Sequence, residues 1–215
     1  MIQIKAFVFN PFMENTYVVY DDETKECAIV DPGCYEDYER KELSDFITEN
    51  NLKVSKLLNT HCHIDHVLGN KYVKDTYHVD LYIHKQDDPT LRAVVTYAPP
   101  YGFNHYESTE ADQYLEEGDS VNIGNYKFDV LFVPGHAPGH IAFINHDQHI
   151  CLSGDVLFQG SIGRTDLPGG DFETLIQSIH QKLFTLDDNF TVYPGHGPTT
   201  SIEIEKKSNP FCAVK

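Results

Sequence analysis

Positive charge is scarce in this chain. Its 215 residues include 16 lysines and arginines against 33 aspartates and glutamates, which gives a formal net charge of −17. Proteins that bind a nucleic-acid backbone need clusters of lysine and arginine to neutralise the phosphates. The charge balance therefore argues against a nucleic-acid partner, and otherwise it bears on solubility rather than on function.

The sequence also lacks a long apolar run and a disulfide framework. No stretch approaches the roughly 18 apolar residues of a membrane span, and residues 2–8 are typical of a strand rather than of a signal peptide. The number of cysteines is odd and their spacing shows no pattern. They are Cys27, Cys34, Cys62, Cys151 and Cys212. We therefore expect a cytoplasmic protein with no membrane partner.

Hydrophobic residues make up 40% of the chain, which is enough for a substantial core. The sequence shows no repeat, low-complexity tract or linker between domains. A length of 215 residues lies near the upper end of ordinary single-domain size. We therefore expect one domain over residues 1–215.

Strand-like and helix-like segments alternate along this domain. The early strands, identified by β-branched and apolar content, are 2–9, 15–20, 26–31 and 56–59. The helices, identified by apolar residues at helical spacing, are 36–50, 66–77, 171–184 and 201–208. We interpret residues 86–114 as a long loop. Its aromatic residues either pin it to the body or line a substrate site, or the loop forms a dimer contact.

The most informative run is Thr60–His66, which holds three histidines and one aspartate within six residues. Imidazole and carboxylate are common ligands of zinc and neighbouring divalent metals. Residues two apart on an extended backbone point the same way, so His61 and His63 can share one metal. Asp65 and His66 lie beyond them and would face a second metal.

Three further donors occur singly, each at the end of an apolar, strand-like run that glycine and proline then break. A rigid strand end holds a ligand well, and a glycine beside it lets the backbone bend sharply. The donors, with the runs that precede them, are His136 (128–133), Asp155 (150–152) and His196 (190–193).

In this order, the motifs resemble those of the metallo-β-lactamase superfamily, and Asp31 matches the family's first motif. The resemblance implies an α+β fold, the αββα sandwich of two packed mixed β-sheets flanked by helices, with the site at one edge. It implies roles as well. The implied ligands are His61, His63 and His136 for a first metal, Asp65, His66 and His196 for a second, and Asp155 as a bridge between the two.

Four residues have implied roles beyond metal binding. Asp155 and Asp65 are expected to be catalytic, with Asp65 helping to orient or deprotonate the attacking water. Asp31 is expected to orient groups of the ligand loop rather than to bind metal, and it is also placed for a turn after a strand. We expect His140 to be a buried, hydrogen-bonded histidine in preference to a ligand.

The segment Phe158–Asp171, with its Gly-Arg-Thr-Asp element, and the ending around 194–211 are similar to the glyoxalase II-like branch and its short relatives. A full-length glyoxalase II adds a helical C-terminal domain that contacts glutathione, and we expect that domain to be missing here. Arg164 is a candidate for binding a substrate carboxylate, because guanidinium matches carboxylate bidentately. The alternative is a structural ion pair with Asp166 or Asp171.

The resemblance implies a metal-dependent hydrolase that cleaves a small thioester, such as S-lactoylglutathione, with a hydroxide that bridges two divalent metals. Zinc is the preferred metal, with iron and manganese as alternatives. A thiolate leaving group, with a pKa near ~8.5, departs without a strong general acid, whereas an amide nitrogen needs protonation.

Three alternatives remain open at this stage. The first is a mononuclear iron persulfide dioxygenase, the second another small ester or lactone hydrolase, and the third a non-catalytic metal-binding domain. In the preferred interpretation the partner is a small-molecule thioester, and the protein is a monomer or a homodimer.

Overall fold

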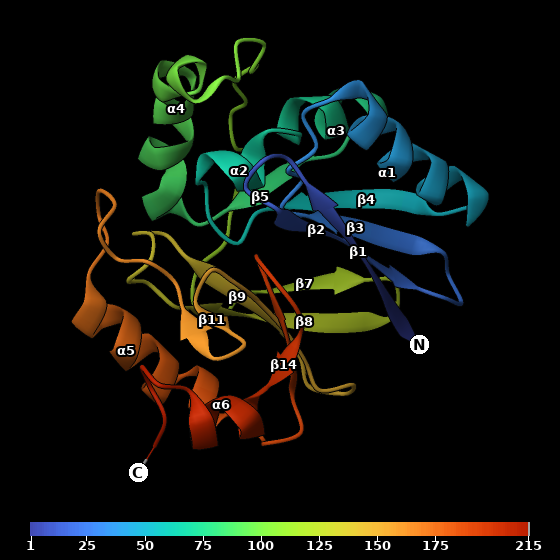
Figure 1. The fold of residues 1–215 in the computed structure, drawn as a ribbon. Coiled ribbons are helices and arrows are strands. Elements are labelled where there is room, and N and C mark those ends of the chain that lie inside the picture. The colour runs from blue at the N-terminus through green and yellow to red at the C-terminus, as the bar shows by residue number, and fades with distance from the viewer. Residues whose placement is uncertain (215) are drawn as a thin grey trace.

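Two six-stranded sheets form the centre of the computed structural model, which describes residues 1–214 (Figure 1). The first sheet has the order β1-β2-β3-β4-β5-β6, and the second has the order β14-β13-β10-β9-β8-β7. The strands of the first sheet are β1 (Ile2–Phe9), β2 (Glu14–Asp21), β3 (Glu26–Val30), β4 (Lys53–Leu58), β5 (Leu81–Ile83) and β6 (Gln113–Tyr114). Those of the second are β7 (Ser120–Ile123), β8 (Tyr126–Phe132), β9 (Ile141–Asn145), β10 (Ile150–Gly154), β13 (Thr191–Pro194) and β14 (Thr200–Ser201).

Both sheets are mixed. In the first, β1, β2 and β3 pair antiparallel, whereas β3 to β6 run parallel to one another. In the second, β10 and β13 are parallel and the other pairs are antiparallel. A separate hairpin joins β11 (Leu157–Phe158) to β12 (Ser161–Ile162).

The helices cover the two outer faces (Figure 1). The first sheet carries α1 (Asp37–Glu49), α2 (Ile64–Val67), α3 (Asn70–Tyr77) and α4 (Asp88–Tyr97), and the second carries α5 (Phe172–Gln181) and α6 (Ile202–Ser208). Short 3₁₀ turns lie at Lys85–Asp87, Pro99–Tyr101 and Leu183–Thr185. This is the predicted αββα arrangement, so the predicted fold class is confirmed. No helix within residues 1–214 is long and apolar enough to cross a membrane.

The alternation of side chains along each strand explains how helices, first sheet, second sheet and helices pack as four layers. In β3, Ala28 and Val30 face the second sheet, whereas Cys27 and Ile29 pack under the helices of the first. Successive side chains of a strand point to opposite faces, so a strand buried on both sides is apolar throughout. The second sheet repeats the pattern, with Phe143 of β9 between the sheets and its neighbours under α5.

The helices predicted over 36–50 and 201–208 occur within one residue of their expected bounds, as α1 and α6. The helix predicted over 171–184 ends three residues early, at Gln181, and the helix predicted over 66–77 is broken. The chain forms α2, then α3, with Gly69 between them. The Gly69 amide donates to the Pro32 carbonyl oxygen at 2.7 Å, and a Cβ atom there would lie 2.5 Å from Cys34 Sγ. Because Gly69 lies so close to the segment Pro32–Cys34, α2 ends before it and the chain changes direction before α3 begins.

The interpretation of 86–114 as a loop is wrong for its first half, which forms α4. Proline in the first turn suits a helix start, and Leu91 and Val94 are buried against the core. Phe103 is also buried in the core, so this residue holds the segment against the body of the protein rather than lining a substrate site. Tyr101 differs, because it is 59% exposed and its ring lies 6.1 Å from that of Phe12.

Candidate metal centre

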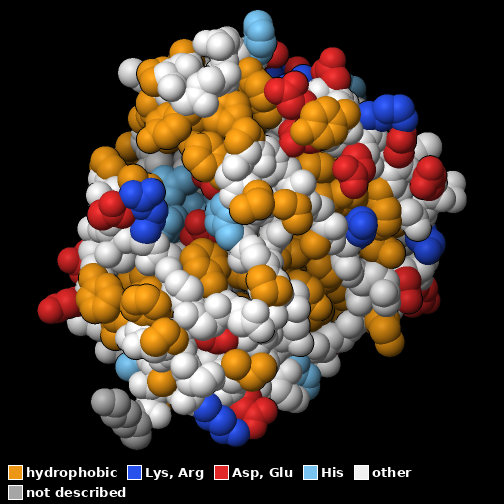
Figure 2. Space-filling view, viewed as in Figure 1, with side chains coloured by type: hydrophobic (Ala, Val, Ile, Leu, Met, Phe, Trp, Pro, Cys, Tyr) orange, Lys and Arg blue, Asp and Glu red, His pale blue; other side chains and the backbone are white. Residues whose placement is uncertain are grey.

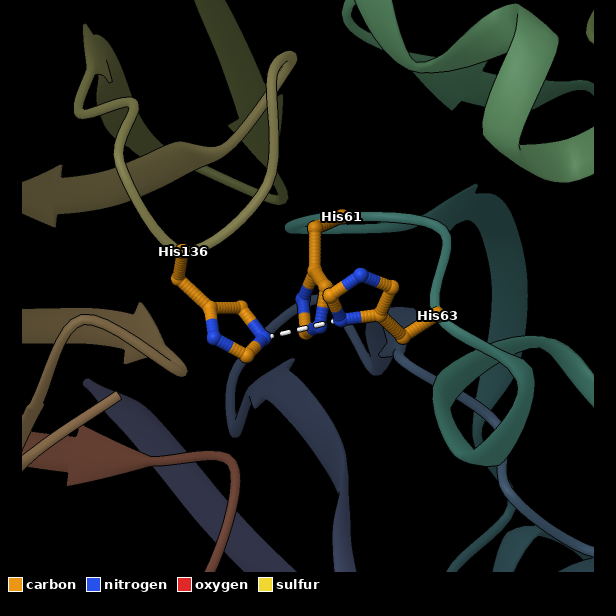
Figure 3. A group of neighbouring side chains, drawn as sticks. All are labelled: His61, His63 and His136. Atoms are coloured by element: carbon orange, nitrogen blue, oxygen red, sulfur yellow. Dashed lines mark hydrogen bonds between the residues drawn. The ribbon is translucent and has the colours of Figure 1, made fainter. Parts of the chain in front are cut away.

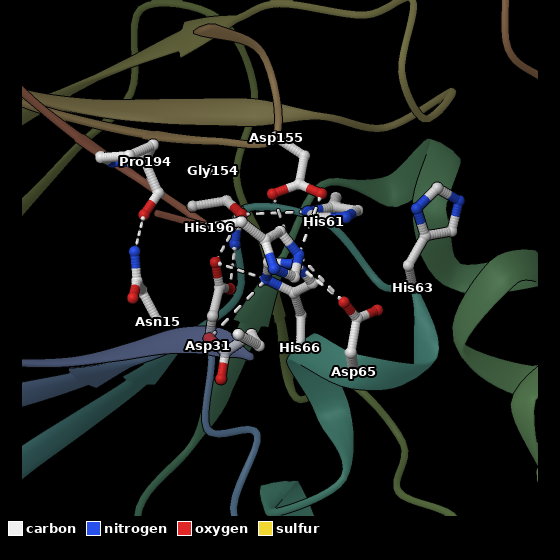
Figure 4. A network of polar contacts seen from close by, with 12 residues as sticks. Asn15, Asp31, His61, His63, Asp65, His66, Gly154, Asp155, Pro194 and His196 are labelled. Carbon is white, nitrogen blue, oxygen red and sulfur yellow. Dashed lines mark hydrogen bonds and ion pairs between the residues drawn. The ribbon is translucent and has the colours of Figure 1, made fainter. Parts of the chain in front are cut away.

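The predicted donors meet at one edge of the two sheets, where loops follow strand ends (Figures 3 and 4). The loop after β4 carries His61 and His63, and α2 carries Asp65 and His66. The remaining donors come from the second sheet. They are His136 between β8 and β9, Asp155 after β10, and His196 after β13.

Two donor groups form there. The ligand atoms of His61, His63 and His136 lie within 4.8 Å of one another, and their rings turn toward a common point (Figure 3). His63 Nδ1 and His136 Nε2 are 2.8 Å apart. The second group consists of Asp65, His66 and His196, whose donor atoms also lie within 4.8 Å of one another.

The Asp155 carboxylate lies between the groups. Its Oδ2 is 3.5 Å from His136 Nε2 and 3.4 Å from His196 Nε2, and its Oδ1 is 3.5 Å from His66 Nε2. The carboxylate therefore faces one histidine of the first group and two of the second. Gly195 permits this approach, because a Cβ atom there would lie 2.1 Å from Asp155 Oδ1.

The far nitrogens of several rings are held by the surrounding protein. His136 Nδ1 donates to the Arg164 carbonyl oxygen at 2.8 Å, and His196 Nδ1 donates to that of Met13 at 3.2 Å. A hydrogen bond at one ring nitrogen fixes the tautomer and leaves the other nitrogen free to bind a metal. The loops thus aim both Nε2 atoms into the centre.

Asp31 is hydrogen-bonded to the loop after β4, which carries His61 and His63. Its carboxylate accepts hydrogen bonds from the Thr60 amide at 2.7 Å and from Thr60 Oγ1 at 2.6 Å. With its proton given to Asp31, Thr60 Oγ1 is left to accept from His61 Nδ1 at 3.1 Å. Asp31 Oδ2 also lies 3.2 Å from His66 Nδ1. Asp31 therefore contacts both the loop of His61 and the ring of His66, and one grouping of donor atoms includes it with these two histidines.

His140 is fully buried, and its Nε2 accepts a hydrogen bond from the Asp155 amide at 3.0 Å. Its ring stacks on that of His61, with centroids 4.6 Å apart. It packs beneath the centre as a hydrogen-bonded histidine, the alternative that the sequence favoured over a ligand.

Buried polar atoms without partners mark the middle of the site. Among residues 1–214, His61 Nε2, His66 Nε2 and Asp155 Oδ1 are buried and lack a hydrogen bond. An unpaired buried polar atom costs about 1–3 kcal/mol, so such atoms seldom gather without a ligand. Nitrogen and carboxylate oxygen at this spacing fit divalent cations such as zinc or iron.

The electrostatics differ between the two groups. Burial, followed by the neighbouring histidines, lowers the pKa of His61, and burial lowers the pKa of His63 to about 3. These rings are therefore neutral at neutral pH, as metal binding requires. Burial also opposes charge on His196, but hydrogen bonds to Asp155 and Asp65 outweigh it and raise the pKa to about 10. The second group thus has a strong negative field that favours a cation.

The site opens to one side. His61, His66, His136 and Asp155 are buried, whereas His63, Asp65 and His196 are partly exposed. Figure 2 shows histidine and acidic side chains at the bottom of a hollow, with hydrophobic side chains gathered around it. A small molecule can therefore reach the donors from this face.

Arg164 forms an ion pair with Asp166, one of the two alternatives that the sequence left open. Its Nε and a terminal nitrogen donate to the two carboxylate oxygens at 2.7 and 2.8 Å, while Asp171 instead caps α5 through the Thr174 amide. The side chains of Arg164 and Asp166 are 60% and 69% exposed. The ion pair therefore lies at the surface of the protein.

The structure adds buried polar residues that the sequence did not indicate. Glu14 lies fully buried with Oε1 3.9 Å from His66 Nδ1, and burial raises its pKa. Asn15 donates to the carbonyl oxygens of Pro194 and Gly197 on either side of His196. The sequence held one signal for these two residues: Glu14 and Asn15 are adjacent polar residues at the start of a strand that is otherwise mostly apolar.

Comparison with known proteins agrees with this geometry. The family profile described as the metallo-β-lactamase superfamily matches residues 9–196. The chain belongs to the metallo-β-lactamase superfamily. Hydroxyacylglutathione hydrolase GloC of Haemophilus influenzae is 39% identical to it over 216 residues, which cover 100% of both chains. The predicted resemblance to this superfamily and to its glyoxalase II-like branch is therefore confirmed.

Solved structures of the superfamily have the same fold. BLEG-1 B3 metallo-β-lactamase superposes with a TM-score of 0.88 at 36% identity, covering 97% of this chain and 99% of its own. TTHA1623, crystallised in a di-iron-bound form, superposes with a TM-score of 0.85 at 33% identity, covering 96% and 99%. These similarities identify the chain as a metallo-hydrolase of the superfamily, whose members use divalent metals.

Proposed function

We propose that this metallo-hydrolase is binuclear and cleaves a small thioester of the S-2-hydroxyacylglutathione type. The observation that carries the proposal is the Asp155 carboxylate, which faces both donor groups within 3.5 Å. The proposed ligands are His61, His63 and His136 for the first ion, Asp65, His66 and His196 for the second, and Asp155 for both. The similarity to hydroxyacylglutathione hydrolase GloC of Haemophilus influenzae supports the substrate class.

Bound cations would supply Lewis acidity and lower the pKa of a water molecule toward neutrality. The chain's own residues hold the donors in place. Asp31 orients His61 and His66, and the Arg164 carbonyl oxygen orients His136. Asp65, with Oδ2 3.1 Å from His196 Nε2, lies at the open side, where it can orient the attacking water.

The carboxylates favour a thioester over an amide. Burial opposes ionisation of Asp155 and of Asp65, but the nearby His66 outweighs it and holds both pKa values below their usual range. Neither group is then a ready proton donor. A thiolate with a pKa near ~8.5 leaves without protonation, whereas an amide nitrogen does not.

The test combines elemental analysis with hydrolysis of S-lactoylglutathione by the purified protein. Two metal ions per chain, zinc in our proposal, with thioester cleavage are expected. One iron per chain, oxygen uptake with a persulfide and no hydrolysis would replace the proposal with a dioxygenase. Opening of a β-lactam in preference to the thioester would favour the activity named for BLEG-1.

We further propose that Arg164 binds a carboxylate of the substrate by exchanging it for Asp166. Arg164→Ala is expected to raise KM about 10-fold with a smaller change in kcat, because a hydrogen bond to a charged group contributes roughly 1.5 kcal/mol. Asp166→Ala, which frees the guanidinium, is expected to lower KM. Steady-state kinetics with S-lactoylglutathione measures both.

The matched control is Arg92→Ala. Arg92 is 61% exposed and pairs with Asp88 at 2.7 Å, as Arg164 does with Asp166, but it lies on α4. This variant is expected to keep the KM of the unmodified protein. Equal KM values for Arg164→Ala and Arg92→Ala would contradict the assignment and leave Arg164 as a surface ion pair.

A further inference from the structure

We propose that Asp87, at the start of α4, is a positioning residue that fixes the two loops carrying the first-group histidines. It is outside both donor groups, and the sequence did not indicate it. The inference rests on the proposed function only in that the first group binds a metal ion, and it makes no assumption about the substrate.

The evidence begins with hydrogen bonds. Asp87 is fully buried, and its Oδ2 accepts from the amide of Cys62, the residue between His61 and His63. Its Oδ1 accepts from the Gly139 amide at 3.1 Å, in the loop that carries His136. One carboxylate therefore ties together the loop after β4 and the loop between β8 and β9, which supply all three ligands of the first group.

Packing makes the connection rigid. A Cβ atom at Gly139 would lie 2.4 Å from the Asp87 amide nitrogen and 2.6 Å from its Cβ. The loop therefore lies directly on the backbone at the start of α4, and a shift of one moves the other. The hydroxyl of Thr90, one turn into α4, donates to Asp87 Oδ1 at 3.3 Å and orients the carboxylate from the helix side.

The charge of Asp87 is otherwise unexplained. Within residues 1–214, no lysine, arginine or histidine nitrogen lies within 4 Å of its carboxylate. Burying a carboxylate is costly unless hydrogen bonds satisfy it. Here the satisfying groups are two backbone amides of ligand loops and one helix hydroxyl. The positive end of the α4 dipole adds to their effect.

Loss of this connection should loosen the first group and spare the second. Residues that orient metal ligands without touching the metal contribute about 10- to 100-fold to affinity. His66 and Asp65 lie on α2, and His196 follows β13; the backbone amides that donate to Asp87 are instead those of Cys62 and Gly139, in the loops of the first group. A residue needed only for folding would weaken both groups alike.

The test measures zinc affinity by competition with a chromophoric chelator in two backgrounds. His196→Ala leaves the first group intact, and His63→Ala leaves the second intact. Asp87→Asn keeps the shape but turns an amide NH₂ toward a backbone N–H. We expect it to weaken zinc binding about 10-fold or more in the His196→Ala background and to leave affinity unchanged in the His63→Ala background.

Two control variants separate positioning from folding. Asp88→Asn changes the next residue, whose carboxylate pairs with Arg92 and Tyr114 rather than with a ligand loop, and should leave zinc affinity unchanged. Asp21→Asn changes another buried aspartate that accepts backbone amides, those of Glu23 and Asn125. It should lower the Tm without changing zinc affinity.

Equal weakening in both backgrounds, or unchanged affinity in the His196→Ala background, would overturn the assignment. If Asp87→Asn does not fold, Thr90→Val tests it instead, because it removes only the hydroxyl that orients the carboxylate. A several-fold loss confined to the first group would then support the role, and no loss would refute it. Zinc affinity requires no thioester, so failure of the substrate proposal would be seen separately.

Discussion

Replacing Asp155 with alanine is expected to remove both metal ions and to lower kcat/KM by at least about 1,000-fold, which corresponds to about 4 kcal/mol. The expectation follows from the position of the carboxylate, which faces His136 in the first donor group and His66 and His196 in the second. Each of the other six proposed ligands belongs to one group.

Metal analysis after gel filtration distinguishes this variant from single-group variants. His63→Ala and His196→Ala should each lose one ion, whereas Asp155→Ala should lose two. A fully active Asp155→Ala protein, or one that keeps both ions, would show that the carboxylate does not bridge. Asp21→Ala serves as the control for loss of a buried aspartate, because Asp21 lies far along the first sheet, beside the N-terminus.

Removing the metal ions with a chelator is expected to abolish hydrolysis and to lower the Tm by about 5–10 °C. An ion present at 100 times its Kd stabilises the native state by about 2.7 kcal/mol, and each kcal/mol shifts the Tm by about 2–4 °C at this chain length. The structural reason is the set of unpaired buried atoms around the centre, including His61 Nε2 and Asp155 Oδ1.

Differential scanning calorimetry with and without chelator measures this shift. Zinc added back should restore both the Tm and the activity. Asp155→Ala supplies the internal control, because a protein that holds no ions should show the same Tm before and after chelation. Full activity in the chelated protein, with no metal detected by elemental analysis, would exclude a metal-dependent reaction.

The predictions that succeeded from sequence alone depend on local patterns. A continuous apolar, partly β-branched run locates β3, and the Asp37–Glu49 helix follows from its charged and apolar faces. The donors also lie in short motifs at strand ends, where Gly195 permits a close backbone approach. These patterns repeat over a few residues, so the sequence shows them directly.

What the sequence did not show depends on contacts between distant segments. Gly69 ends α2 because the chain at Pro32 lies against it, and no local signal records that approach. The buried carboxylate of Asp87 looks like that of an ordinary surface acid until the fold encloses it. Helix α4 was missed because aromatic residues and prolines in the same stretch are also typical of loops.

The hydrogen bond from Asn15 to the Pro194 carbonyl oxygen has a consequence for folding kinetics. It joins residues 179 positions apart, and with the Asn15 bond to Gly197 it holds the loop of His196. Contacts of such long sequence separation form late, after shorter loops have closed. During synthesis, His61, His63, Asp65 and His66 emerge together as a partial chelator, long before His196 is positioned to complete the centre. The order of folding thus leaves an interval in which an available cation can enter before the enclosure that selects it has formed.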